Sequence, residues 1–194
     1  MEKNCFISTL VLFFKPNKLI QYIAQSILYK CEKEILHIYL VRHAESDHSL
    51  RWGSDAARPL SDIGKRQQMK AAKKFRVLGI NYDEAWVSPF LRAKQTLDII
   101  QSSREEPAPQ KEVFNLEVHG DPQKIYQKLS QEFKKYPKKR LLLVGHNPNI
   151  SNLLYMLVKN HQRRMKTSEV AWIIWDQGSI SLKEYFDKET LLSE

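Results

Sequence analysis

Two histidines follow directly after apolar runs that are typical of buried strands. The first run ends in Arg42-His43, and the second ends in Gly145-His146. A third apolar run leads through a Ser-Pro dipeptide to Arg92, in the first turn of an expected helix. Arginine binds phosphate oxygens in pairs, and ligands of open α/β sheets bind at the carboxyl ends of strands. Strand ends that carry Arg-His, Arg and His therefore predict a pocket for a phosphoryl group.

The residue types also predict how such a pocket would react. A neutral imidazole can attack phosphorus and carry the phosphoryl group covalently, and this is the role we expect for His43. Its other ring nitrogen should then keep a proton and donate a hydrogen bond to a backbone carbonyl. We expect Arg42 and Arg92 to clamp the phosphoryl oxygens, and His146 to stabilise the charge that develops on them in the transition state.

Four segments of the chain resemble the histidine phosphatase superfamily, whose fold is shared with phosphoglycerate mutases. The resemblance is strongest to its small SixA-like phosphohistidine phosphatase branch and runs from about residue 35 to about residue 186. A lone Arg-His pair is weak support, but four segments in the same order are specific, because each predicts its local context independently. The segments are Leu40–Ser46, Ala57–Gly64, Ser88–Thr96 and Val144–Pro148.

The resemblance implies further contacts with the substrate, from Arg58, Gly145 and Asn147. Gly145 would let the backbone approach the ligand closely. Arg58 lies in an Arg-Pro-Leu segment that is typical of the SixA-like branch. A pocket contact and a salt bridge within the loop are equally good interpretations of Arg58.

The chain departs from many superfamily members at the general acid. Those members carry a glutamate on an insertion after the second strand–helix unit, whereas only the short stretch 102–111 is available here. The nearest candidates are Glu117, His119 and Asp121, and Asp121 is also expected to cap a helix. A weak acid favours phosphohistidine, because a leaving imidazole is protonated more easily than an alkoxide. An open pocket would also admit a side chain on a folded protein.

Strands that alternate with helices predict an α/β fold. We expect a three-layer sandwich with a mostly parallel central sheet, helices on both faces and a C-terminal hairpin around Gly178. The expected strands are 35–42, 84–88, 111–118, 140–145, 170–175 and 180–186. The expected helices run from Ser61 or Asp62 to Leu78, from Pro89, from Asp121-Pro122, and from Asn147-Pro148 to Lys159.

The chain divides into an N-terminal extension (1–34), a histidine phosphatase domain (35–186) and a C-terminal tail (187–194). The extension carries an apolar run that is too short to span a bilayer, followed by apolar residues at helical spacing. It is interpreted as a docked helix, a membrane-surface anchor or sequence upstream of the true start. A dispensable extension is favoured over membrane contact, and a cytoplasmic monomer is expected.

Composition narrows the remaining functions. The net charge is +9, much of it in short basic runs that are more typical of solvated faces than of a nucleic-acid site. The two cysteines form no metal-binding or redox spacing, and no nucleotide or metal motif occurs, so no cofactor is expected. The favoured function is a phosphatase acting on phosphohistidine in proteins. The alternatives are a broad phosphomonoesterase acting on small phosphate esters, a mutase, a non-catalytic phospho-binding module and a nucleic-acid-binding protein.

Overall fold

A computed structural model describes residues 35–49, 52–159, 161–176 and 179–193. These residues form one sheet of six strands in the order β3-β2-β4-β1-β5-β6. The strands are β1 (Ile35–Arg42), β2 (Glu84–Val87), β3 (Gln110–Glu112), β4 (Arg140–Gly145), β5 (Val170–Asp176) and β6 (Ser179–Phe186). The helices are α2 (Asp62–Val77), α3 (Leu91–Ser102), α4 (Pro122–Lys135), α5 (Asn149–Leu157), α6 (Lys188–Leu192) and the 3₁₀ turn η3 (Phe114–Leu116).

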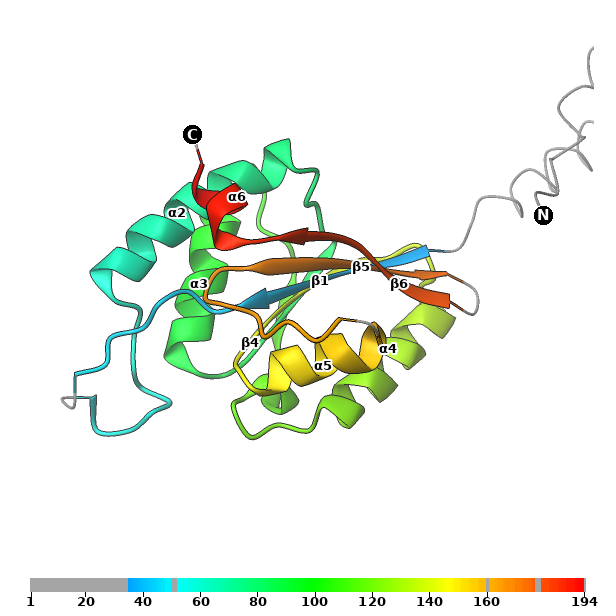
Figure 1. The fold of residues 1–194 in the computed structure, drawn as a ribbon, viewed down its shortest axis with the longest axis horizontal. Helices are drawn as coiled ribbons and strands as arrows, with labels where there is room; N and C mark the ends of the chain where they lie inside the picture. The colour runs from blue at the N-terminus through cyan, green and yellow to red at the C-terminus, as the bar shows by residue number, and fades with distance from the viewer. Residues whose placement is uncertain (1–34, 50–51, 160, 177–178, 194) are drawn as a thin grey trace, which may run out of the picture. The chain divides into compact units, whose positions relative to one another are not determined.

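The sheet is covered on both faces, as a three-layer α/β sandwich requires. Helices α2 and α3 lie on one face and helices α4 and α5 on the other (Figure 1). Alternate residues of each strand supply the two cores, because successive side chains of a strand point to opposite faces. Leu40 packs toward α4 and α5, whereas Tyr39 and Val41 pack toward α2 and α3.

The pairing of β1 with β4 brings the two histidine segments together. Four strands are parallel, and β5 and β6 form the expected antiparallel hairpin. In the register of β1 and β4, Arg42 lies opposite Gly145. The backbone N–H of His43 donates to the Gly145 carbonyl at 3.0 Å. His43 and His146 therefore leave the sheet at the same edge, on neighbouring strands.

The expected strand 111–118 is wrong over most of its length. Strand β3 ends at Glu112, and the chain continues into η3, whose Leu116 is buried under α4 and α5. The side-chain amide of Asn149 donates to the carbonyls of Asn115 and, at 2.9 Å, of Glu117. These bonds from α5 satisfy backbone carbonyls of the turn. They depend on a residue more than thirty positions away, so no local pattern in the sequence predicts them.

Two helix starts also differ from the expectation. Helix α3 begins at Leu91 after Phe90, so Pro89 precedes the helix instead of opening it, and the side chain of Leu91 is partly exposed. Helix α5 begins at Asn149 after Pro148 and ends at Leu157. Asn147 does not cap the backbone N–H groups of α5, because its side-chain amide bonds to the Met165 carbonyl and to the Ser151 hydroxyl.

Other capping predictions are confirmed. Ser61 caps α2 by accepting a hydrogen bond from the Gly64 N–H at 2.9 Å. Gly79 follows α2 with a positive φ of 69°, a conformation that suits glycine. Asp121 caps α4 through the Gln123 N–H at 2.9 Å.

The two ends of the chain can be compared with the expected boundaries only in part. Residues 187–194, expected as a tail, include helix α6, whose Leu191 is buried in the core beside α2 and α3. Residues 1–34 and Gly178 lie outside the described residues. Within the described ranges, no helix combines the length and apolarity needed to cross a membrane.

Candidate active site

A cavity of about 280 Å³ lies at the carboxyl ends of β1 and β4. Its lining includes all four residues to which the sequence assigns catalytic roles: Arg42, His43, Arg92 and His146. The other lining residues are Glu45, Ser46, His48, Asp55, Arg58, Val118, Asn147 and Thr167. Segments that are far apart in the sequence thus converge on one small, positively charged cavity.

His43 is held as a neutral imidazole with one nitrogen turned to the cavity. Its Nδ1 lies 2.6 Å from the Ala44 carbonyl oxygen, which fixes the proton on Nδ1 and leaves Nε2 with a lone pair. Burial, and then the charges of Arg92 and Arg42, lower the pKa of His43 to about 3, despite the bond to Ala44. The ring therefore meets the two requirements of a nucleophile, an oriented nitrogen and no charge at neutral pH.

His146 lies beside His43 and is also neutral. The two ring centroids are 4.7 Å apart, and the ring of Phe90 covers His146 at 5.0 Å. Nε2 of His146 lies 2.9 Å from Ser88 Oγ, while its buried Nδ1 has no hydrogen-bond partner. Burial first, and then the positive neighbours, lower its pKa to about 2. With Nδ1 carrying the proton, His146 has a donor available for a ligand oxygen.

Arg92 is almost completely buried, with 1% of its surface exposed, yet each of its three side-chain nitrogens makes a hydrogen bond. Its Nε lies 3.4 Å from Nε2 of His43. Its Nη1 donates to the backbone carbonyl of Asp55 at 2.6 Å, and its Nη2 to the Asp55 carboxylate at 2.9 Å. Helix α3 positions Arg92 in its first turn, so the guanidinium reaches the strand ends as expected.

Arg42 is anchored by the segment that joins α5 to β5. Its Nη1 donates to the Met165 carbonyl at 3.0 Å, and its buried Nε has no partner. The same Met165 carbonyl accepts from the amide of Asn147 at 2.6 Å. Asn147 in turn accepts from the Ser151 hydroxyl at 2.5 Å, so it also ties this segment to α5.

Arg58 combines the two interpretations that the sequence left open. It lines the cavity, and its Nε and Nη2 bond to Asp55 Oδ1 at 3.0 and 2.7 Å, as in a loop salt bridge. Its Nη1 bonds to Ser46 Oγ at 2.8 Å and lies 3.1 Å from His48 Nδ1. Gly145 does not line the cavity; a Cβ there would lie only 3.1 Å from the Leu116 carbonyl oxygen, so the glycine permits close packing of η3.

None of the three candidate acids lines the cavity. The segment between η3 and α4 contributes only Val118 to the lining. Asp121 is committed to the cap of α4, and the side chain of His119 is exposed. The connection 103–109 contributes no residue to the lining either. Its Ala108 is bonded to the side-chain amide of Gln101 on α3, through the Ala108 N–H at 3.0 Å and the Ala108 carbonyl at 2.8 Å.

Asp55 is the main feature of the pocket that the sequence analysis missed. Its carboxylate bonds to both Arg92 and Arg58. Burial alone would raise the pKa of Asp55, but the hydrogen bonds from the two arginines lower it. An aspartate in a polar loop carries no local pattern that predicts a partner on α3, so only the folded chain reveals the contact.

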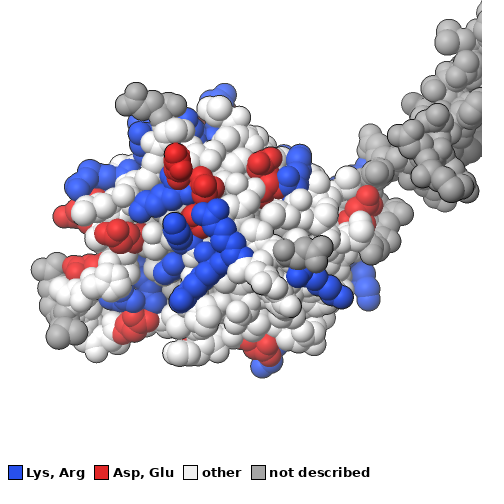
Figure 2. All heavy atoms as spheres, viewed as in Figure 1, with Lys and Arg blue, Asp and Glu red and all other residues white. Residues whose placement is uncertain are grey.

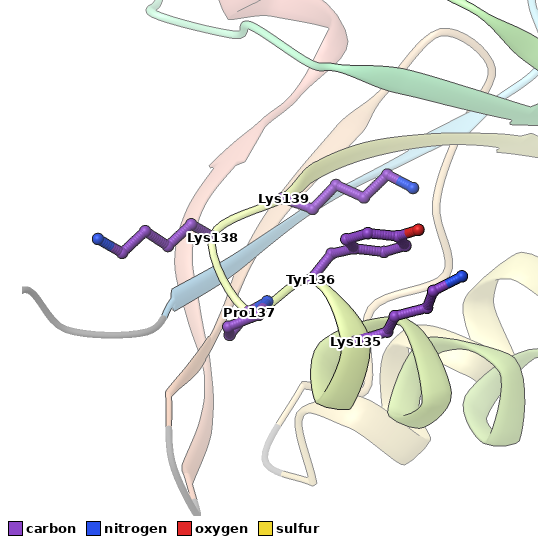
Figure 3. Close-up of a pocket in the computed structure, with 5 residues that line it drawn as sticks. All are labelled: Lys135, Tyr136, Pro137, Lys138 and Lys139. Carbon is purple, nitrogen blue, oxygen red and sulfur yellow. The ribbon is translucent and has the colours of Figure 1, made fainter. Parts of the chain in front are cut away.

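A larger hollow, of about 460 Å³, lies at the turn between α4 and β4 and is lined by residues 135–139 (Figure 3). This turn precedes β4, whereas His146 follows that strand, so the hollow lies at the opposite end of the sheet from the histidines. Lys139 bonds to Glu84 at 2.5 Å and to Glu132 at 3.0 Å. The basic run is thus partly neutralised, and no histidine lines the hollow.

Comparisons with known proteins agree with this geometry. Residues 38–115 match the model of the histidine phosphatase superfamily (branch 1). An uncharacterized protein of Picosynechococcus sp. (strain ATCC 27264 / PCC 7002 / PR-6) is 27% identical over 160 residues, which cover 81% of this chain and 94% of that protein. Residues 38–115 are thus similar to the histidine phosphatase superfamily, and this match together with the fold supports a phosphatase.

Solved structures show the same fold. The protein histidine phosphatase SixA complexed with tungstate has a TM-score of 0.73 and 24% identity, covering 80% of this chain and 99% of that chain. Phosphoglycerate mutase from Bacillus anthracis str. Sterne has a TM-score of 0.67 and 13% identity, covering 84% of this chain and 97% of that chain. At these identities the likeness is one of fold, and the two structures carry different activities.

Proposed function

We propose that this protein hydrolyses phosphohistidine on proteins, through a covalent intermediate on His43. The observation that carries the proposal is the state of His43: neutral, with Nδ1 tied to a backbone carbonyl and Nε2 turned to a cavity lined by three arginines. A binding module would need the arginines but not a preoriented nucleophile.

The reaction would proceed in two displacements. Nε2 of His43 attacks phosphorus, the bond from phosphorus to the substrate's imidazole nitrogen breaks, and the leaving imidazole takes up a proton. Water then attacks the phosphoryl group on His43, which releases inorganic phosphate and restores the free imidazole. Arg42, Arg92 and a donor on His146 would stabilise the negative charge on the phosphoryl oxygens during both steps.

The lining of the pocket supports phosphohistidine over alkyl phosphates. Expulsion of an alkoxide benefits about 10²- to 10⁴-fold from a positioned acid. Glu117, His119 and Asp121 are absent from the lining, and Val118 stands there instead. An imidazole leaving group has less need of such an acid.

The surface around the pocket supports a protein substrate. Lys and Arg side chains form a band across the middle of one face, over the segment that joins α5 to β5 (Figure 2). Arg164 and Lys166 of this segment are exposed, and neighbouring Thr167 lines the pocket. A positive rim would attract the acidic surface of a phosphorylated protein.

The proposal is tested by comparing kcat/KM on phosphohistidine-containing carrier proteins with kcat/KM on p-nitrophenyl phosphate and glycerol phosphate. Preference for the carrier proteins by a factor of ten or more is expected. Efficient hydrolysis of glycerol phosphate, with no activity on the carriers, would instead support a general phosphomonoesterase of the same fold.

A further inference from the structure

The carboxylate of Asp55 lies between Arg58 and Arg92, two arginines that line the cavity proposed to bind the phosphoryl group. Oδ1 accepts from Nε and Nη2 of Arg58, and Oδ2 accepts from Nη2 of Arg92. All three residues line the cavity that contains His43. A carboxylate bonded to a pair of guanidinium groups uses the same donors that two phosphoryl oxygens would use.

The burial of the partners is unequal. Arg92 is 1% exposed, so its charge needs an anion in the pocket at all times. The side chain of Asp55 is 54% exposed and sits on a loop, so it can turn to solvent without opening the core. The cation is therefore fixed, and the anion that neutralises it is the exchangeable member of the pair.

We propose that Asp55 is a built-in anion that occupies the phosphoryl subsite of the free enzyme and is displaced by the substrate. The inference rests on the proposed function for the identity of the displacing group, a phosphoryl group with free oxygens for both Arg92 and Arg58. When the product leaves, the carboxylate returns to the two arginines and competes with inorganic phosphate for them.

This exchange makes Asp55 a determinant of specificity. A ligand must replace the bonds to both guanidinium groups in order to displace the carboxylate. A phosphoryl group joined to one substituent offers three free oxygens, whereas a phosphodiester offers two and carries less charge. Asp55 would therefore exclude diesters and weak anions and would limit inhibition by inorganic phosphate.

The test is calorimetric titration of the full chain with inorganic phosphate, which requires no turnover. Asp55→Asn keeps the shape of the side chain and removes its charge, so phosphate should bind about ten-fold more tightly or better. Asp62→Asn is the matched control, because Asp62 is exposed and pairs with Lys65 outside the cavity. This control should leave the phosphate affinity unchanged.

If the role of Asp55 were only structural, its replacement would change the phosphate affinity in the opposite direction. If Asp55 only positioned Arg92 and Arg58, then Asp55→Asn and Asp55→Ala would both weaken phosphate binding, and the proposal would be overturned. Equal tightening by Asp62→Asn would also overturn it, by showing a general effect of net charge. Thermal unfolding with and without phosphate provides a second readout that detects a variant that has not folded.

The result of the phosphate-binding experiment does not depend on whether phosphohistidine proves to be the substrate. Tighter phosphate binding by Asp55→Asn supports the built-in anion even if carrier proteins are not substrates. Where the wild type does turn over a substrate, the inhibition constant of inorganic phosphate should fall in the Asp55→Asn variant by the same factor as the dissociation constant. An unchanged inhibition constant would contradict displacement during the catalytic cycle.

Discussion

The rings of His43 and His146 lie 4.7 Å apart, although the two residues end strands that are separated by most of the domain's sequence. Each ring is buried and neutral. His43 Nδ1 bonds to the Ala44 carbonyl, its Nε2 accepts a long hydrogen bond of 3.4 Å from Arg92 Nε, and His146 Nε2 bonds to Ser88 Oγ. A ligand would therefore meet the lone pair of His43 Nε2 beside Arg92 Nε, and the unpartnered Nδ1 of His146.

Replacement of His43 should abolish turnover and leave the fold intact. The His43→Ala variant has no nitrogen that can attack phosphorus, so kcat should fall below detection, and no acid-labile phosphoenzyme should form with labelled substrate. The control is His119→Ala, which removes an exposed histidine outside the cavity and should keep wild-type activity on phosphohistidine. Undiminished turnover by His43→Ala would overturn the mechanism.

Arg92→Lys should not rescue activity, although it keeps the charge. Lysine has no planar fork, so it cannot bond to the Asp55 backbone carbonyl, face His43 and also make paired contacts with phosphoryl oxygens. The loss of one charge-assisted bond, about 1.5–3 kcal/mol, corresponds to a fall in kcat/KM of roughly 10- to 100-fold. The measurement is steady-state kinetics, and wild-type kinetics in the lysine variant would remove Arg92 from the catalytic machinery.

The alternation of apolar and polar runs predicted the sheet apart from β3, because the other strands and the helices that follow them carry clear local patterns. The convergence of four residues on one cavity was predictable for the same reason, because each stands at a strand end or in the first turn of a helix, and their catalytic roles stay predictions; the four are Arg42, His43, Arg92 and His146. Asp55, Ser88 and Met165 were not, because their roles depend on contacts with distant segments. The turn η3 replaced an expected strand because Asn149, on another element, satisfies its carbonyls.

Rates should depend steeply on the pKa of the leaving group. The three acids expected from the segment 117–121 do not line the cavity. Of the two carboxylates that do, Asp55 pairs with Arg58 and Arg92, and Glu45 accepts a hydrogen bond from Ser61 Oγ, so we expect weak protonation of the leaving group. Aryl phosphates and phosphohistidine should be cleaved at least about 10²-fold faster than alkyl phosphates at neutral pH. The check is a series of phosphate esters of graded leaving-group pKa, together with Glu117→Gln and Asp121→Asn. A flat series would show that an effective acid is present.

Charge reversal at the rim should affect protein substrates selectively. The double variant Arg164→Glu/Lys166→Glu should raise KM for a phosphorylated carrier protein about ten-fold and leave p-nitrophenyl phosphate unaffected, because the small ester does not reach the rim. Lys70→Glu/Lys73→Glu on α2 makes the same change in net charge at exposed positions and is the matched control. Equal effects of the two double variants would indicate a general influence of charge rather than docking.

Stability should fall as the pH drops from 7 to 5, because two histidines are buried without charge. Their pKa values are lowered from 6.5 to about 3 for His43 and about 2 for His146, first by burial. The unfolded chain therefore takes up protons below pH 6.5 that the folded chain does not, and each histidine costs about 2 kcal/mol of stability at pH 5. The lowered carboxyl pKa values of Asp55 and Glu84 act in the same direction but at lower pH.

Urea unfolding at pH 7 and pH 5 checks this prediction, and the double variant His43→Asn/His146→Asn should flatten the dependence of stability on pH. If the double variant loses as much stability as the wild type between pH 7 and pH 5, the two rings are not held neutral in the folded protein.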